Sequence, residues 1–228
     1  LFMVLDNDDQ AMNPNIPLYL RLQEQGIQIF LLVCNIPGFP IPSITYDDYN
    51  ASRSLVKFLK EKGCRRLVHV SRLDNASTTV ERIRGFKDGL LEQSLPYDER
   101  RIVRVKCADI DSVVHDATER FCEFLKSDNA VDAVVCSDEL VASGVFDALD
   151  RLAIPPRSRP IVGGMGCAKN LHVLKGNPYL LAEDDTVRLG REATRAALKG
   201  EFPTSREKSS ESFRRVIPVP LRVPKSLR

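Results

Sequence analysis

Short polar side chains gather where the apolar runs of this 228-residue chain end, and they are the residues best suited to chemistry. Their carboxylates and hydroxyls could hold a ligand that carries several hydroxyl groups or charges. Asp and Ser are also the preferred amino-terminal caps of helices, so for any single position capping is the stronger interpretation. For the whole set, a binding site is the stronger one. These polar stretches lie at 6–9, 46–48, 71–79, 107–111, 137–139 and 163–166.

The acidic stretch 6–9 offers an enzymatic alternative, because carboxylates there could hold Mg²⁺ for phosphoryl chemistry. Against this, no glycine-rich phosphate loop with a lysine follows an apolar run. His69, His115 and His172 lack the spacing of metal ligands, and His69, inside an apolar run, is interpreted as a hydrogen-bonded core residue. No Ser–His–Asp or Cys–His set is suggested. We therefore predict no enzyme activity, no metal and no cofactor.

Composition limits the class of protein. Lysine and arginine total 33 against 31 acidic residues, and a net charge of +2 gives no reason to expect that this chain itself binds nucleic acid. Apolar runs such as 29–34 are too short to span a bilayer. The six cysteines form no C-x-x-C pair and several lie in apolar runs, which favours reduced thiols and a cytoplasmic location.

Apolar runs alternate with segments of helical periodicity along the whole chain. Continuous apolar strands between amphipathic helices predict an α/β fold with parallel sheets flanked by helices, and ligands at the carboxyl ends of the strands. We expect strands at 1–5, 27–33, 67–70, 102–105, 131–136, 160–162 and 180–182, with an extended segment at 213–223. We expect helices at 16–25, 49–62, 77–93, 113–126, 140–152, 170–175 and 187–198.

The order of several motifs resembles the ligand-binding domain of LacI/GalR-type transcriptional regulators. Segment 77–86 is similar to the family pattern of a hydroxyl residue followed by Arg-x-x-Gly-Phe. Segment 132–149 is similar to the family's Asn/Asp-Asp-x-x-Ala-x-Gly strand and helix. Segments 152–163 and 215–223 resemble the strands that follow. The early part, 15–48, is most similar to the arabinose-repressor-like branch.

The resemblance implies a two-lobed, periplasmic-binding-protein-like (type I) fold whose first lobe is incomplete. The implied lobes are 1–63 with 183–204, and 64–182 with 205–228. It also implies a homodimeric repressor-type regulator that binds a small, sugar-like effector in the cleft between the lobes. Operator DNA would be bound only through a DNA-binding domain outside this chain, and we expect that domain and part of the first lobe to precede Leu1. The alternative is a periplasmic solute-binding protein of the same fold, which a secretion signal upstream would identify.

Roles carried over from the resemblance name the first group of ligand residues. Arg82 matches the family arginine that reaches into the cleft, and its planar fork of donors suits hydroxyls or a carboxylate. Thr78, one helical turn earlier, matches the hydroxyl contact, and Asn75 lies in the same loop. Asp138 matches the Asn/Asp whose side chain binds ligand hydroxyls.

Three further positions complete the predicted site. Asp47 could bind ligand from the first lobe, with its neighbour Asp48 as the competitor, and one of the two is expected to cap a helix. Asp109 lies near a family contact loop. Met165 stands where the family has the aspartate that binds a sugar hydroxyl, so only a soft apolar surface is expected there. This departure leaves a less hydroxylated ligand open.

Overall fold

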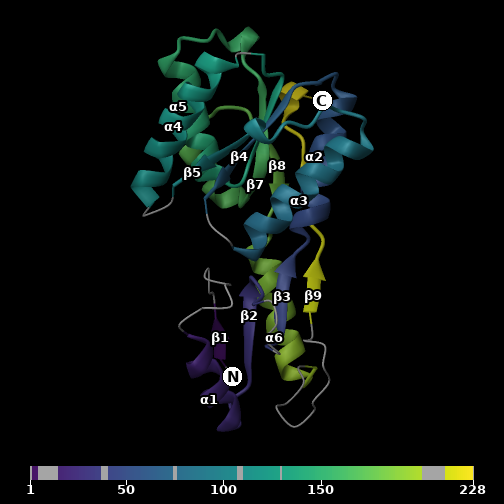
Figure 1. Ribbon diagram of the computed structural model, residues 1–228. Helices are drawn as coiled ribbons and strands as arrows, with labels where there is room; N and C mark the ends of the chain where they lie inside the picture. Colours follow the sequence, from purple (N-terminus) through teal and green to yellow (C-terminus); the bar gives the residue numbers. More distant parts are fainter. Residues whose placement is uncertain are drawn as a thin grey trace. The chain divides into compact units, whose positions relative to one another are not determined.

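The computed structural model describes residues 2–4, 15–36, 41–73, 76–106, 110–128, 130–201 and 214–227. These residues form two compact units, each of which has its own sheet (Figure 1). Unit 1 comprises 1–47, 75–80 and 185–218, and unit 2 comprises 48–74, 81–184 and 219–228. Asn75 and Asp109, two of the predicted site residues, lie outside the described residues, as does the acidic stretch 6–9.

Unit 1 is built on a parallel sheet with the strand order β1-β2-β3-β9. The strands are β1 (Phe2–Val4), β2 (Ile29–Val33), β3 (Ser43–Tyr46) and β9 (Arg214–Ile217). Two helices belong to this unit, α1 (Ile16–Glu24) and α6 (Thr186–Leu198). Apolar side chains of α1 and β2, among them Ile16, Tyr19 and Leu31, form its core.

Unit 2 is built on a six-stranded sheet with the order β10-β8-β7-β6-β4-β5, in which β10 alone is antiparallel among the described strands. The strands are β4 (Leu67–Arg72), β5 (Ile102–Val105), β6 (Ala133–Cys136), β7 (Ile161–Gly166), β8 (Leu180–Glu183) and β10 (Leu221–Arg222). The helices are α2 (Asp48–Glu61), α3 (Ser77–Glu92), α4 (Ile110–Ser127) and α5 (Glu139–Arg151), although the first four residues of α3 cluster with unit 1. The 3-10 helices are η1 (Glu99–Arg101), η2 (Pro156–Ser158), η3 (Ala168–Leu174) and η4 (Lys225–Leu227).

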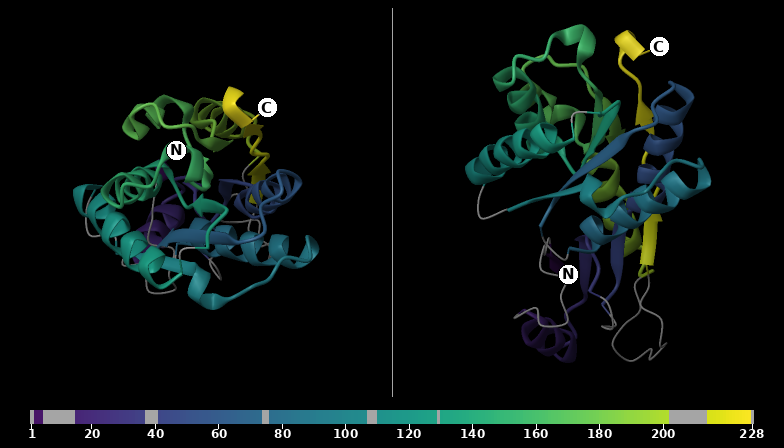
Figure 2. Two further views of the ribbon diagram at one scale, coloured as in Figure 1. Left: turned by 90° about the horizontal axis from the view of Figure 1, so that it is seen from above. Right: turned by 45° about the horizontal axis from the view of Figure 1, so that its top comes forward.

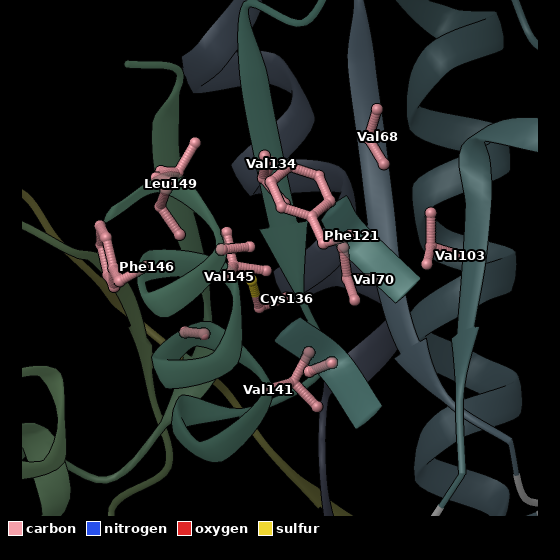
Figure 3. Close-up of a cluster of buried hydrophobic side chains, with 14 of the residues drawn as sticks. Val68, Val70, Val103, Phe121, Val134, Cys136, Val141, Val145, Phe146 and Leu149 are labelled. Carbon is pink, nitrogen blue, oxygen red and sulfur yellow. The ribbon is translucent and has the colours of Figure 1, made fainter. Parts of the chain in front are cut away.

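The side chains of the central strands alternate between two buried layers, because successive residues of a strand face opposite sides of the sheet. Val68 and Val134 belong to the cluster beneath α4 and α5, where Phe121 is fully buried (Figure 3). Leu67 and Val135 belong to the second cluster, with residues of α2 and α3. Figure 2 shows these two helix pairs on opposite faces of the sheet. Both faces are covered, so the strands can be continuously apolar, as the sequence predicts.

The observed units divide the chain differently from the predicted lobes at four places, 48–63, 75–80, 183–184 and 205–218, of which the first and the last are the longest. The predicted boundary at Gly63 put α2 in the first lobe, but α2 packs against β6, β7 and β8 and so clusters with unit 2. Segment 205–228 was predicted in the second lobe, whereas β9 pairs in parallel with β3 of unit 1. Among the described residues, no helix has the length and apolar character needed to cross a membrane.

Candidate functional site

Polar side chains of unit 2 gather at one edge of its sheet, where the parallel strands β4, β6, β7 and β8 end. Arg72 is the last residue of β4, Ser137 and Asp138 follow β6, and Asp184 follows β8. Parallel strands present their carboxyl ends at the same edge, so residues distant in sequence meet there. We call this set, together with Asp48 and Arg82, the polar cluster.

Arg82 is the centre of the polar cluster. Its Nε donates to Asp48 Oδ1 at 2.6 Å, one terminal nitrogen donates to the Ser137 carbonyl oxygen at 2.7 Å, and the other lies 3.4 Å from Asp184 Oδ2. The residue is only 9% exposed. Among the described residues, these contacts engage three of the five N–H groups of the guanidinium. Two N–H groups therefore remain to donate to a ligand.

A glycine in the predicted motif explains why Arg82 can reach Asp48. A Cβ on Gly85 would lie 2.2 Å from the carbonyl oxygen of Tyr49, a distance that no side chain tolerates. The absence of a side chain therefore lets α3 approach the first turn of α2, where Asp48 is 4% exposed. The Arg-x-x-Gly spacing thus serves the packing of two helices and the placement of the guanidinium together.

The charges of the polar cluster are strongly coupled. Burial by itself would lower the pKa of Arg82, but the nearby carboxylates of Asp48 and Asp184 outweigh it and raise that pKa. Burial raises the pKa of Asp184 to about 7; Arg82 opposes the rise, while the negative charges of Asp48, Glu139 and Asp138 add to it. Asp184 Oδ1 is buried and has no hydrogen-bond partner among the described residues. Asp184 is therefore partly protonated near neutral pH, and one of its oxygens is available.

Asp138 has a structural role in this conformation. Its Oδ1 accepts from the backbone N–H groups of Leu140 and Val141 and so caps α5. Its Oδ2 accepts from Arg72 Nε at 2.6 Å and from the Ser137 hydroxyl at 3.2 Å. Burial would raise the pKa of Asp138, but the hydrogen bond and charge of Arg72 lower it overall. A carboxylate has about four acceptor sites, and all four are in use here.

The remaining predicted positions are placed as follows. Asp47 is half-buried in unit 1 and its backbone N–H donates to the Ile217 carbonyl, whereas the competitor Asp48 is the carboxylate that contacts Arg82. Thr78 is half-buried in the first turn of α3. Met165 is 1% exposed and packs in the core cluster beneath α2, so it has almost no surface to present to a ligand.

The residue before Met165 is a glycine, and the neighbouring backbone gives a physical reason. A Cβ on Gly164 would lie 2.0 Å from the Cys136 carbonyl oxygen and 2.6 Å from the Tyr179 hydroxyl oxygen. Tyr179 donates from that hydroxyl to the Met165 carbonyl at 2.9 Å. A large side chain cannot be accommodated at Gly164, because the Cys136 backbone and Tyr179 already fill the space that it would enter.

Sequence reasoning missed Arg72 and Asp184 as members of the polar cluster. Both positions carried a usable signal, because each lies at the end of a predicted strand at the edge where ligands bind. Among the described residues, and so also in the polar cluster, no group of three or more His, Cys, Asp or Glu residues is arranged to hold a metal ion. The described cysteines, Cys34, Cys64, Cys122, Cys136 and Cys167, are all free thiols.

Comparison with known proteins places these features in a family. Residues 11–155 match the family described as periplasmic binding proteins and sugar binding domain of LacI family. The chain is 25% identical over 142 residues to the HTH-type transcriptional regulator MalR of Streptococcus pneumoniae, a match that covers 61% of this chain and 42% of MalR. The chain therefore spans less than half the length of this curated relative.

Solved structures share the fold over nearly the whole chain. A transcriptional regulator CelR–cellobiose complex superposes with a TM-score of 0.74 at 23% identity, covering 97% of this chain and 63% of that one. A LacI family regulator from Enterococcus faecium with bound ribose gives 0.74 at 17%, covering 97% and 76%. The Caulobacter myo-inositol binding protein gives 0.73 at 20%, covering 99% and 74%. The predicted periplasmic-binding-protein-like fold is confirmed, and the chain belongs to the family of periplasmic binding proteins and sugar-binding domains of the LacI type.

Proposed function

We propose that this chain is the effector-binding part of a transcriptional regulator and that a small hydroxylated molecule binds at the polar cluster of unit 2. The observation that carries the proposal is the buried guanidinium of Arg82, which has donors to spare beside Asp184, a carboxyl group with a free oxygen. Burying such charges away from water is costly, and a binding site is one reason for a protein to keep them.

The charges of the cluster favour a neutral ligand. Three carboxyl groups, those of Asp48, Asp138 and Asp184, surround two guanidinium groups, those of Arg72 and Arg82. An anionic ligand would add negative charge to a site that already has more acids than bases. Hydroxyl groups can donate to the carboxylates and accept from the guanidinium, so a sugar or polyol fits best. CelR with cellobiose and the regulator with ribose agree with this ligand class.

Other parts of the function stay predictions. A homodimer, an operator bound through a separate DNA-binding domain, and an effector seated between two lobes are properties that the family resemblance implies. The absence of enzyme activity agrees with relatives that are regulators and binding proteins. A cytoplasmic location agrees with the five free thiols among the described residues.

Calorimetry on Arg82 variants tests the proposal. The titrants are cellobiose, ribose, myo-inositol and a wider panel of neutral sugars. We expect at least one to bind, and we expect Arg82→Ala to weaken it by 100-fold or more, since a charge-assisted bond contributes on the order of 1.5–3 kcal/mol and its buried partners would be left unpaired.

Arg84→Ala is the matched control, because Arg84 is two residues away on the same helix, is exposed and pairs with Glu81. Circular dichroism establishes that each variant is folded. Unchanged affinity in folded Arg82→Ala, or no binding by any member of the panel, would contradict the proposed site.

A further inference from the structure

An acidic side chain lies at the end of β7: Glu139, which stands at the second acidic position of the Asn/Asp-Asp-x-x-Ala-x-Gly pattern. Glu139, the first residue of α5, is 9% exposed, and its Oε2 lies 2.8 Å from the place that a Cβ on Gly166 would occupy. Any side chain at position 166 would therefore displace this carboxylate. The space at the strand end is taken by Glu139, which reaches it from the neighbouring helix.

Glu139 is held in place at one oxygen only. Its Oε1 accepts from the side-chain amide of Asn170 at 2.5 Å, and Asn170 lies in η3, the 3-10 helix that follows β7. Among the described residues, Oε2 has no hydrogen-bond partner. A buried carboxylate with one anchored oxygen and one unused oxygen is positioned to accept a bond from something else.

A second acidic residue, Asp184, contacts the same glycine through its backbone. The backbone N–H of Asp184 donates to the Gly166 carbonyl oxygen at 2.8 Å, and the buried Oδ1 of Asp184 is also without a partner among the described residues. The negative charge of Glu139 contributes to the raised pKa of Asp184, which agrees with the closeness of the two groups. The two carboxyl groups together supply unused oxygens for the hydroxyls of a ligand.

We propose that Glu139 is a ligand-binding, specificity-determining residue that accepts a hydroxyl of the effector in place of the acid that the family has where this chain has Met165. Met165 packs in the core, so β7 itself supplies no acid at this position. Glu139 and Asp184 then bind neighbouring hydroxyls of a neutral polyol, with Arg82 donating to a ligand oxygen. The inference rests on the proposed function, and it names Glu139 as the residue that replaces the family aspartate at the position of Met165.

Glu139→Gln tests the inference, because it keeps the shape of the side chain and removes its charge. The ligand used is the best binder of the wild-type protein among cellobiose, ribose, myo-inositol and the neutral sugar panel. We expect Glu139→Gln to weaken that ligand at least tenfold in calorimetry, since a bond to a charged acceptor is about twice as strong as a neutral one. Gly166→Ala, whose Cβ would collide with Oε2, should weaken it as well.

Glu119→Gln is the matched control, since Glu119 is a half-buried glutamate of α4, away from the polar cluster in sequence and paired with Arg151. Its affinity should equal that of the wild-type protein, and thermal unfolding without ligand should show that every variant is folded. Equal affinity in wild type and folded Glu139→Gln would overturn the role of Glu139 and leave the proposed function standing. If no panel member binds the wild-type protein, the proposed function fails, and this inference fails with it.

Discussion

Acidification should destabilise unit 2 through one buried histidine. His69 lies in β4 with no exposed surface, and its ring stacks on Phe86 of α3 with 5.1 Å between the ring centroids. Neither ring nitrogen makes a regular hydrogen bond among the described residues. Burial lowers the pKa of His69 to about 3; the Val135 backbone opposes this, and the positive charges of Arg104 and Arg82 add to the lowering.

The direction of the effect follows from the proton count. Above the ordinary histidine pKa of 6.5, the folded and unfolded states are both neutral at this position, and the full stability is present. Below pH 6.5, His69 binds a proton in the unfolded chain, whereas in the folded protein it stays neutral until the pH approaches 3. Each unit of pH in this window removes about 1.4 kcal/mol from the free energy of unfolding, so the loss is about 2 kcal/mol at pH 5.

Urea unfolding at pH 7, 6 and 5 measures this loss. His69→Leu removes the pH dependence of stability that this histidine contributes. Between pH 7 and pH 5, the free energy of unfolding of the variant should therefore rise by about 2 kcal/mol relative to that of the wild-type protein. His115→Gln, a change at an exposed position on α4, should follow the wild-type protein. A stability difference for His69→Leu that does not change with pH would refute the reasoning.

Three other substitutions should separate backbone packing from charge. Gly144→Ala should lose about 1–3 kcal/mol in urea unfolding, because its Cβ would lie 2.5 Å from Ala117 Cβ where α4 packs on α5. Gly190→Ala, in a helix with nothing within 4 Å of the new Cβ, should instead gain up to about 1 kcal/mol. Asp132→Asn should lose about 1–2 kcal/mol at pH 7, because the side chain and backbone of Arg66 hold the Asp132 pKa near 2. The Asp132 contribution is present above the ordinary pKa of 3.8 and disappears as the pH falls toward 2, so wild type and variant should converge in acid.

The elements with strong periodicity could be predicted from the sequence, and the weak ones could not. The helix expected at 140–152 is α5, Glu139–Arg151, and the strand expected at 131–136 contains β6, Ala133–Cys136. Strand β3, Ser43–Tyr46, was not predicted, because four residues directly after a proline-rich loop are too few to show a period. The prediction that His69 is a hydrogen-bonded core residue was half wrong: it is buried and stacks on Phe86, but neither ring nitrogen makes a regular hydrogen bond among the described residues.

The partners of Arg82 could not be predicted from spacing. Asp48, Ser137 and Asp184 lie 34, 55 and 102 positions away from it, so only the order of strands in the sheet brings them together. The Arg-x-x-Gly motif identified Arg82. Its glycine, Gly85, is required by the close contact between α3 and the start of α2. The strand-end rule identified the region but could not say which carboxylates would be used as caps and which would stay available.

That distinction decides the chemistry of the polar cluster. Asp138, the residue that the resemblance favoured as a hydroxyl acceptor, has its acceptor sites filled by the α5 cap, Ser137 and Arg72. A ligand hydroxyl could reach it only by displacing Arg72 or unwinding the first turn of α5, and both cost free energy. Asp184 and Glu139 each have an unused oxygen and require no such exchange. Selection among sugars should therefore depend more on these two acids than on Asp138, because a ligand gains most from groups that the protein has not already satisfied.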